Sequence, residues 1–285
     1  MINVLVTGGN GQLAKCIKDL ENKNNDLKII YSDYQELDIT DLHAIEVFFK
    51  TTPIDYCINC AAYTAVDLAE NNQLKASEIN ELGAKNLAVV CQNNQATLIH
   101  ISTDFVFSGK QTGFYKEEDI PNPISVYGET KHLGEAQIQN HLSKYFILRT
   151  SWLYSEHGNN FMKTMIRLSS EKEQLSVVTD QIGTPTYATD LASVILQLIV
   201  TNNNQYGIYH YSNEGVASWY DFAKAIFEEI DSKIKLLPIK TTQYPTPAKR
   251  PQFSVLDKSK IKNTLKIEIP YWRDSLRKAI LNYDR

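Results

Sequence analysis

The feature that most constrains the fold is a glycine-rich turn placed directly after the first apolar run of the chain. The segment TGGNGQLA begins at Thr7, and Gly8, Gly11 and Ala14 fit a GxxGxx(G/A) pattern. Small residues let backbone amides approach a pyrophosphate, and the N-terminus of a following helix adds unpaired N–H groups. A glycine pattern alone is a weak signal, but its place between a strand and a helix is what the motif requires. We therefore expect a dinucleotide site that includes Gly8 and Gly11.

Short apolar runs alternate with amphipathic segments over residues 1–150. The runs that predict strands are residues 3–7, 28–32, 56–59, 97–102 and 146–149. Helical patterns lie between them, for example at 42–50 and 76–93. Repeated β-α-β units predict an α/β fold with a Rossmann-like, doubly wound parallel sheet, whose ligands bind outside the carboxyl ends of the strands.

The alternation becomes less regular after residue 150. Residues 161–169 and 190–200 predict helices, QLSVV (174–178) is strand-like, and residues 207–211 predict a strand that returns to the sheet. The prolines of YPTPAKRP (244–251) indicate an ordered loop. We predict a dinucleotide-binding domain of residues 1–150 plus roughly 175–212. A smaller substrate-binding domain takes roughly 151–174 and 213–285.

Composition argues against several classes of protein. The net charge of −4 gives no reason to expect a nucleic-acid partner. No apolar run approaches the ~20 residues of a membrane helix, and the first residues do not resemble a signal peptide. We therefore expect a cytoplasmic protein with no membrane partner. The CxxC of Cys57 and Cys60 lies in an apolar stretch without a second ligand pair, which indicates buried thiols and no metal site.

An acidic residue after the second predicted strand bears on the choice of cofactor. Asp33 follows Gly11 at about the 20-residue interval expected for a carboxylate that binds the adenosine ribose. Residues 31–40 contain no lysine or arginine to neutralise a 2′-phosphate, so this segment favours NADH over NADPH. Alternatively, Asp33 and Asp38 serve only as turn and cap residues.

Tyr127 and Lys131 form a candidate proton-donor pair in SVYGETKHLGE. Their spacing of four places both side chains on one face of a helix. A free tyrosine has a pKa near ~10, and a nearby ammonium favours the phenolate, so we expect Lys131 to lower the pKa of Tyr127. In a carbonyl reduction the phenol would protonate the developing alkoxide while a hydride arrives from a nicotinamide.

Tyr-x-x-x-Lys is a weak pattern by itself, because it also occurs by chance: Tyr220 and Lys224 have the same spacing on a helix face that we predict to be solvated. The Tyr127 pair differs because the strand ATLIHIS ends at Ser102 and Thr103, where hydroxyls reach the expected ligand crevice. A hydroxyl there can polarise a substrate carbonyl. His100, within the same strand, is typical of a buried histidine with hydrogen-bonding partners.

Sequence blocks along the whole chain resemble a known enzyme family. TGGNGQLA, NCAAYTAVD, ISTDFVF and YGETKHLGE resemble the extended short-chain dehydrogenase/reductases. CAAYTAVDLAE, STDFVFSG, RTSWLY, GNNFMKTMIRL, DQIGTPT and YPTPAKRP narrow the resemblance to the dTDP-4-dehydrorhamnose reductases. The resemblance implies that NADH or NADPH reduces the C4 ketone of dTDP-4-dehydro-L-rhamnose, giving dTDP-L-rhamnose.

The resemblance also implies roles for individual residues. Tyr127 would be the proton donor, Lys131 its partner and ribose ligand, and Thr103 the third catalytic residue. The further residues expected at the cofactor are Gln12, Leu13, Asp38, Ile39, Ala61, Ala62, Tyr63 and Ser102. Those expected at the substrate are Asp104, Phe105, Trp152, Asn160 and Arg250. Alternatively, Asn160 caps a helix, and Arg250, our candidate for the diphosphate, only orders its loop.

The chain departs from the family at one site. Some members form dimers through a metal held by glutamates, and the corresponding positions here are Cys16 and Asn282, which are poor ligands for a hard cation. We therefore expect a monomer or a dimer without a bridging metal. The functional alternatives are a reductase of another 4-keto sugar nucleotide, an epimerase or dehydratase, and a non-catalytic regulatory subunit that binds dinucleotide.

Overall fold

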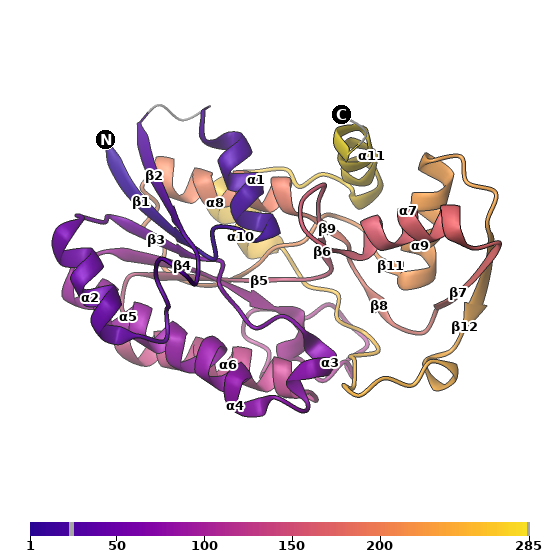
Figure 1. The fold of residues 1–285 in the computed structure, drawn as a ribbon, viewed down its shortest axis with the longest axis horizontal. Coiled ribbons are helices and arrows are strands. Elements are labelled where there is room, and N and C mark those ends of the chain that lie inside the picture. The colour runs from indigo at the N-terminus through magenta and orange to yellow at the C-terminus, as the bar shows by residue number, and fades with distance from the viewer. Residues whose placement is uncertain (23–25, 284–285) are drawn as a thin grey trace.

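The computed structural model describes residues 1–22 and 26–283, and its central feature is a six-stranded sheet (Figure 1). All neighbouring strands in this sheet run parallel. Their order is β10 (Gly207–His210), β5 (Tyr145–Thr150), β4 (Thr97–Thr103), β3 (Tyr56–Asn59), β1 (Ile2–Thr7) and β2 (Leu27–Ser32). Because β2 and β3 lie on opposite sides of β1, the strand order reverses there, and a ligand crevice is expected at that point.

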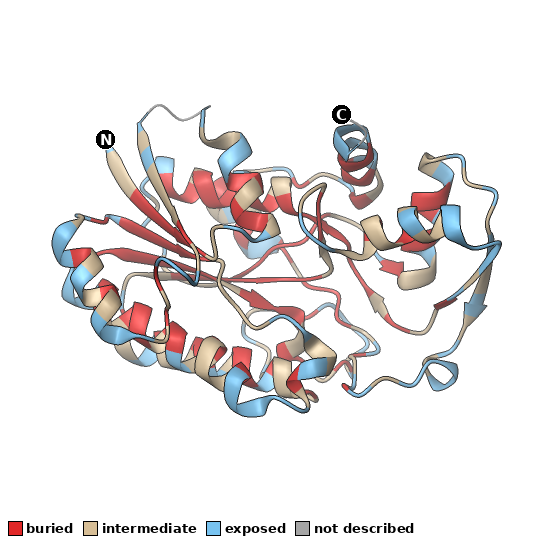
Figure 2. Cartoon of the chain, in the orientation of Figure 1, coloured by how far each residue is buried: buried red, intermediate tan, exposed pale blue. Residues whose placement is uncertain are grey.

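Helices cover both faces of the sheet, as the alternating sequence predicts (Figures 1 and 2). One face carries α1 (Gln12–Glu21), α8 (Ala188–Val200) and α10 (Ser259–Leu265). The other carries α2 (Leu42–Thr51), α5 (Gly83–Asn93) and α6 (Val126–His141). Side chains of β1 alternate between the two layers, with Val4 and Val6 in one core and Leu5 in the other.

Helix α6 packs unusually close to its neighbours because it contains two glycines on its inner side. A Cβ at Gly128 would lie 2.2 Å from the carbonyl oxygen of Phe105, and one at Gly134 would lie 2.2 Å from that of Asn80. The helix begins after Ser125, whose Oγ accepts a hydrogen bond from the Gly128 amide at 3.2 Å. These contacts fix the height of the helix above the end of β4.

The expected helix 76–93 is interrupted. It divides into α4 (Gln73–Ser77), a π-helical turn (Glu78–Leu82) and α5. The wide turn carries Asn80, whose Oδ1 accepts from the Tyr63 amide at 2.8 Å and whose Nδ2 donates to Thr130 Oγ1 at 3.0 Å. A π-turn inside a helix is frequent near functional sites, and this one connects the loop after β3 to α6. That loop also holds the short helix α3 (Val66–Ala69), and β4 leads into a 3₁₀ turn, Asp104–Val106.

A smaller lobe with its own apolar core adjoins the sheet (Figure 1). Its helices are α7 (Phe161–Glu171), α9 (Trp219–Glu229) and α11 (Trp272–Tyr283), with a 3₁₀ turn at Thr241–Gln243. Its paired strands are β6 (Leu153–Tyr154) with β9 (Thr186–Tyr187), β7 (Gln174–Val178) with β12 (Lys235–Ile239), and β8 (Ile182–Gly183) with β11 (Ala217–Ser218).

Residues 175–212, which the sequence assigns to the dinucleotide-binding domain, are divided between the two parts. Strand β10 joins the six-stranded sheet and α8 packs on it, whereas β7 pairs with β12 in the smaller lobe. The division into two domains remains a prediction. The last two residues of the predicted substrate-binding domain lie outside the described part of the chain. Within the described residues, no helix combines the length and apolarity needed to cross a bilayer.

Candidate active site

A cavity of about 950 Å³ lies at the carboxyl ends of the parallel strands and is walled by both lobes. It brings together most of the residues singled out in the sequence. These are Gly8, Gly11, Gln12, Leu13, Asp33, Asp38, Ile39, Ala61, Ala62, Ser102, Thr103, Asp104, Phe105, Tyr127, Lys131, Trp152 and Arg250. The volume falls within the range of cofactor and ligand sites.

Two expected residues do not line this cavity. The backbone of Tyr63 is held by Asn80, which accepts from its amide at 2.8 Å and donates to its carbonyl at 3.2 Å. Asn160 caps α7, because its Oδ1 accepts from the Lys163 amide at 3.1 Å and its Nδ2 donates to Ser155 O at 2.7 Å. The capping alternative thus accounts for Asn160.

The glycine loop has the geometry of an anion site. Gly8 has φ of +66°, and a Cβ there would lie 2.7 Å from Ala61 N, so the loop and the end of β3 approach closely. Gly11 is the N-cap residue of α1 and makes no side-chain cap, and among the described residues no side chain is bonded to the first amides of this helix. The amides at the start of α1 therefore have no side-chain partner, as a pyrophosphate site requires.

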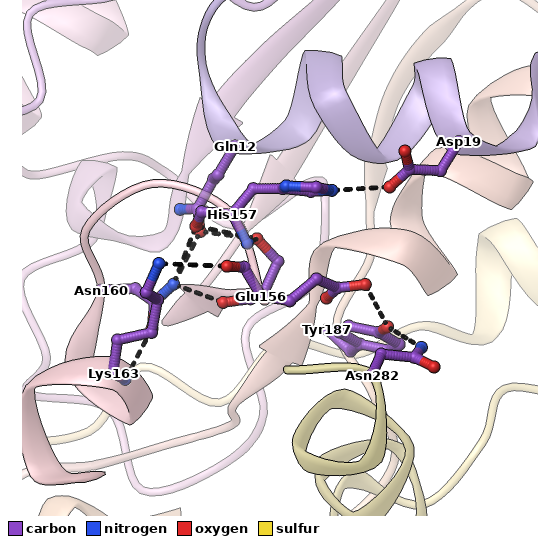
Figure 3. A network of polar contacts seen from close by, with 9 residues as sticks. Gln12, Asp19, Glu156, His157, Asn160, Lys163, Tyr187 and Asn282 are labelled. Carbon is purple, nitrogen blue, oxygen red and sulfur yellow. Dashed lines mark hydrogen bonds and ion pairs between the residues drawn. The ribbon is translucent and has the colours of Figure 1, made fainter. Parts of the chain in front are cut away.

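The side chain of Gln12 connects this loop to the smaller lobe (Figure 3). Its Nε2 donates to Leu153 O at 3.3 Å, and its Oε1 accepts from Asn160 Nδ2 at 3.4 Å. Nearby, His157 Nε2 lies 2.6 Å from Asp19 Oδ2 on α1 (Figure 3). These contacts dock the segment after β6 against α1. They leave the backbone of Gln12, but not its side chain, free to face a cofactor.

The two positions that replace metal-binding glutamates have other partners. Cys16 is buried, and burial raises the pKa of its thiol to about 11. Asn282 donates to Tyr187 Oη at 3.1 Å (Figure 3). Within the described residues, Asp19, Glu156 and His157 are the one group of three or more metal-ligating residues whose ligand atoms all lie within 4.8 Å of one another. Two of these three already bond to each other.

Asp33 and Asp38 line the wall of the cavity and also accept hydrogen bonds from backbone amides of the turn in which they lie. Asp33 Oδ1 accepts from the Tyr34 amide at 2.8 Å, and Asp38 Oδ1 accepts from the Thr40 amide at 2.9 Å. Lys75, from α4, also lines this wall and pairs with Glu78 at 2.8 Å. The sequence analysis of residues 31–40 did not identify this positive charge, because Lys75 lies far from that segment in the sequence.

Lys131 is buried beneath the cavity floor. Its Nζ donates to Ile101 O at 2.7 Å and lies 3.1 Å from His100 Nε2. Burial lowers the pKa of Lys131 to about 8. Burial also raises the pKa of Tyr127 to about 12, and a hydrogen bond with Thr103 only partly opposes this. The expected lowering of the Tyr127 pKa is therefore wrong for this arrangement, because the Lys131 amino group faces the sheet.

The end of β4 presents two buried residues to the cavity. Thr103 Oγ1 accepts from the Phe105 amide at 3.2 Å, which shapes the turn after the strand. Asp104 accepts from Ser254 Oγ at 2.5 Å, and burial raises its pKa to about 6. The Phe105 ring packs edge-on against that of Tyr127, with centroids 5.5 Å apart. Serine 254 belongs to the C-terminal part of the chain and was not found from sequence.

Ser102, expected at the cofactor, has an internal partner. Its Oγ donates to Glu135 Oε1 at 2.5 Å, and Glu135 also binds the guanidinium of Arg149, whose Nη2 lies 2.7 Å from Oε2. All three residues are buried. This buried charge pair joins α6 to β5, so Ser102 helps to hold the two elements together.

The smaller lobe contributes aromatic and cationic groups. Trp152 has φ of +46° and stacks on Trp219, a cavity residue of α9 that the sequence analysis did not identify. Arg250 binds both carboxylate oxygens of Asp67, with Nη1–Oδ1 of 3.1 Å and Nη2–Oδ2 of 2.7 Å. The guanidinium proposed for a substrate diphosphate therefore already has a carboxylate partner, whose pKa it lowers.

Comparisons with known proteins agree with this geometry. Residues 2–285 match the family described as the RmlD substrate binding domain. A dTDP-4-dehydrorhamnose reductase of Aggregatibacter actinomycetemcomitans is 41% identical, and the alignment covers 97% of this chain and 98% of that protein. A Clostridium acetobutylicum dTDP-4-dehydrorhamnose reductase structure gives a TM-score of 0.96 at 42% identity, covering 100% of each chain.

A second solved structure is that of dTDP-4-dehydrorhamnose reductase from Bacillus anthracis in complex with NADP. It gives a TM-score of 0.95 at 41% identity and covers 99% of this chain and 100% of that one. Full-length similarity in sequence and in structure leads to the same family as the motifs around the cavity. The chain belongs to the RmlD family, that of the dTDP-4-dehydrorhamnose reductases.

Proposed function

We propose that this protein reduces the C4 ketone of dTDP-4-dehydro-L-rhamnose to dTDP-L-rhamnose with NADH or NADPH. The main support for this proposal is that Tyr127, Thr103, Lys131 and the glycine loop all line the same cavity. The names of the relatives supply the sugar nucleotide. When bound, the dihydronicotinamide supplies a hydride to C4.

Side chains of the protein donate the proton and orient the substrate. Tyr127 Oη gives its proton to the C4 oxygen as negative charge develops there, and Thr103 Oγ1 donates a hydrogen bond to the same oxygen. Burial keeps Tyr127 protonated at neutral pH, since its pKa lies at about 12. Its proton becomes favourable to release only when a strong base, the developing alkoxide, forms beside it.

Lys131 supplies a positive charge that stabilises the phenolate left after proton transfer. Trp152 offers an apolar ring to one face of the hexose. The uncapped amides of α1 and the close approach of Gly8 to Ala61 support the dinucleotide part of the site. Asp33 favours NADH and Lys75 favours NADPH, so the preference for NADH stays a prediction.

The test follows NADH absorbance with purified protein, dTDP-4-dehydro-6-deoxyglucose and a 3,5-epimerase. Oxidation that depends on the epimerase, with dTDP-L-rhamnose as product, supports the proposal. Oxidation without the epimerase identifies a reductase of another 4-keto sugar nucleotide. A protein that binds NADH but oxidises none with any 4-keto sugar nucleotide is a regulatory subunit, and interconversion without net oxidation identifies an epimerase or dehydratase.

A further inference from the structure

A line of buried polar side chains crosses the sheet below the cavity, from β1 through β3 and β4 to α6. Thr7 Oγ1 donates to Asn59 Oδ1 at 2.8 Å, and Asn59 Nδ2 lies 3.0 Å from His100 Nδ1. Lys131 Nζ completes the line at 3.1 Å from His100 Nε2. Each of these four residues is 1% exposed, so the line is shielded from bulk water.

The amide of Asn59 has one possible orientation. The backbone N–H of Ala61 points at Asn59 Oδ1 from 3.1 Å, and a peptide N–H can only donate. The atom that faces it must therefore be the oxygen, and the NH₂ group must face His100. Consequently His100 Nδ1 is an acceptor.

The proton of His100 therefore lies on its other nitrogen. Burial holds the pKa of His100 well below its ordinary value, so the ring is neutral and carries one N–H. With Nδ1 accepting from Asn59, the N–H is at Nε2 and points at Lys131 Nζ. An ammonium group has only donors, so a protonated Lys131 would place two donors 3.1 Å apart.

The charges around Lys131 do not remove this conflict. Glu135, one turn further along α6, favours the ammonium form, but it is shared with Arg149 at 2.7 Å. The thiol of Cys60, at the end of β3, is the other group that acts on Lys131. Burial outweighs the effects of Glu135 and Cys60 and lowers the pKa of Lys131 to about 8. The neutral and the protonated forms of Lys131 are therefore both accessible near neutral pH.

We propose that His100 is a positioning residue that couples the protonation of Lys131 to its location. The neutral amine of Lys131 accepts the Nε2–H of His100 and stays against the sheet. The ammonium is displaced from His100 towards Tyr127 and the cavity, and its added proton comes from solvent. The role of the displaced ammonium rests on the proposed reduction, whereas the state of the histidine ring does not.

The coupling gives the enzyme a cation where the phenol loses its proton. In the inward position, Lys131 is not among the groups that shift the pKa of Tyr127. In the outward position it lies on the same helix face, one turn away, and stabilises the phenolate. Histidine 100 acts only through Lys131, since it does not line the cavity.

The direct test is ¹⁵N NMR of the histidine-labelled protein, with and without NADH, across pH 6–10. The chain has six histidines, and spectra of His100→Gln and His210→Gln assign the two buried strand histidines. We expect His100 to remain neutral with its proton on Nε2. A proton on Nδ1, or an imidazolium, overturns the proposal whatever the substrate of the enzyme is.

Kinetics test the coupling itself. In His100→Gln, the carboxamide can present its oxygen to the ammonium, so the alkaline pKa of kcat/KM should rise by about one unit, a tenfold change in proton affinity. His210→Gln is the control, because His210 neighbours Arg149 at 3.5 Å rather than Lys131, and its alkaline pKa should match wild type. A His100→Gln enzyme that is slower at every pH with an unmoved alkaline pKa has lost only structure, and the proposal fails.

Discussion

The indole of Trp152 stacks on that of Trp219, with ring centroids 3.7 Å apart and planes 9° from parallel. Trp219 therefore covers one face of the Trp152 indole, and Gly183 packs against it as well, since a Cβ there would lie 2.7 Å from Cε2; a hexose can reach only the part of the indole that these two residues leave exposed. We predict that Trp152→Ala raises the KM for the sugar nucleotide about tenfold or more, with a smaller effect on kcat. Steady-state kinetics measure both, and an unchanged KM would remove Trp152 from the substrate site.

Trp219→Ala tests the stack separately. An aromatic pair contributes about 0.5–1.5 kcal/mol beyond burial, so losing Trp219 should raise the same KM by about two- to tenfold. The affinity for NADH, measured by fluorescence titration, should not change in either variant. A larger effect from Trp219→Ala than from Trp152→Ala would show that Trp219 is itself the main sugar contact.

Tyr127→Phe removes the proposed proton donor and preserves the ring that packs on Phe105. We expect kcat to fall about 10²-fold or more, since general acid catalysis contributes on that scale. Binding of NADH should remain close to wild type, because the phenol oxygen is not part of the glycine loop. Normal turnover by this variant would disprove the assignment of the donor.

The pH dependence of kcat/KM should have an alkaline limb near pH 8. The ammonium form of Lys131 is the active one, its pKa is about 8, and it loses its proton as the pH rises. Activity should therefore fall about tenfold per pH unit above that value. Tyr127, with a pKa of about 12, remains protonated throughout and cannot cause this limb. A rate constant unchanged up to pH 10 would contradict the assignment.

The buried pair of Glu135 and Arg149 should matter for folding. Glu135→Gln leaves the Arg149 guanidinium without its counter-charge, which costs about 3–5 kcal/mol of unfolding free energy. Urea unfolding at pH 7 measures it. The matched control is Glu171→Gln, which breaks an exposed pair with Arg167 and should cost less than about 1 kcal/mol. Equal losses in both variants would refute this role.

The same carboxyl links stability to pH. Burial alone would raise the pKa of Glu135, but its hydrogen bonds to Arg149 and Ser102, together with the nearby His132, lower it to about 2, from 4.5. The stabilisation is therefore complete above pH 4.5 and is lost as the pH falls towards about 2. In Glu135→Gln, this part of the acid dependence should disappear, which unfolding curves between pH 3 and pH 6 would detect.

Cofactor preference should respond to Lys75. Its ammonium lies on the cavity wall with Tyr34 and Asp38, where it can reach an adenosine 2′-phosphate after leaving Glu78. Lys75→Glu should lower kcat/KM for NADPH several-fold relative to NADH, the scale of an exposed charge pair. Lys50→Glu, on the exposed side of α2, is the control. An unchanged ratio in Lys75→Glu would leave the choice to Asp33.

The sheet could be predicted from sequence because its strands are short apolar runs separated by recognisable helices. Every strand predicted within residues 1–150 is present, and the return of residues 207–211 appears as β10. The prediction of a continuous helix over 76–93 missed the interruption, because the spacing of apolar residues does not reveal a turn that contains one extra residue. The π-turn at Glu78–Leu82 is instead fixed by Asn80 and its partners on other elements.

The residues around the cavity could be predicted where a motif carries them and not where only folding brings them together. Lys75 and Trp219 reach the wall from distant segments, and no local pattern identifies either. Arg250 was identified, but its partner Asp67 was not, since the two are far apart in sequence. The direction of the Tyr127 pKa was wrong because helix spacing fixes which residues are neighbours, but not which way a lysine turns.

The two glycines of α6 have a consequence for how such enzymes diverge. Alanine at Gly128 would collide with Phe105 O in the turn after β4, and alanine at Gly134 with Asn80 O in the π-turn, so either would shift the helix and carry Tyr127 and Lys131 with it. The spacing of the pair would survive, while its height above Thr103 would not. A descendant of this chain with one added methyl group could keep Tyr127, Lys131 and Thr103, fold, and still have lost its chemistry.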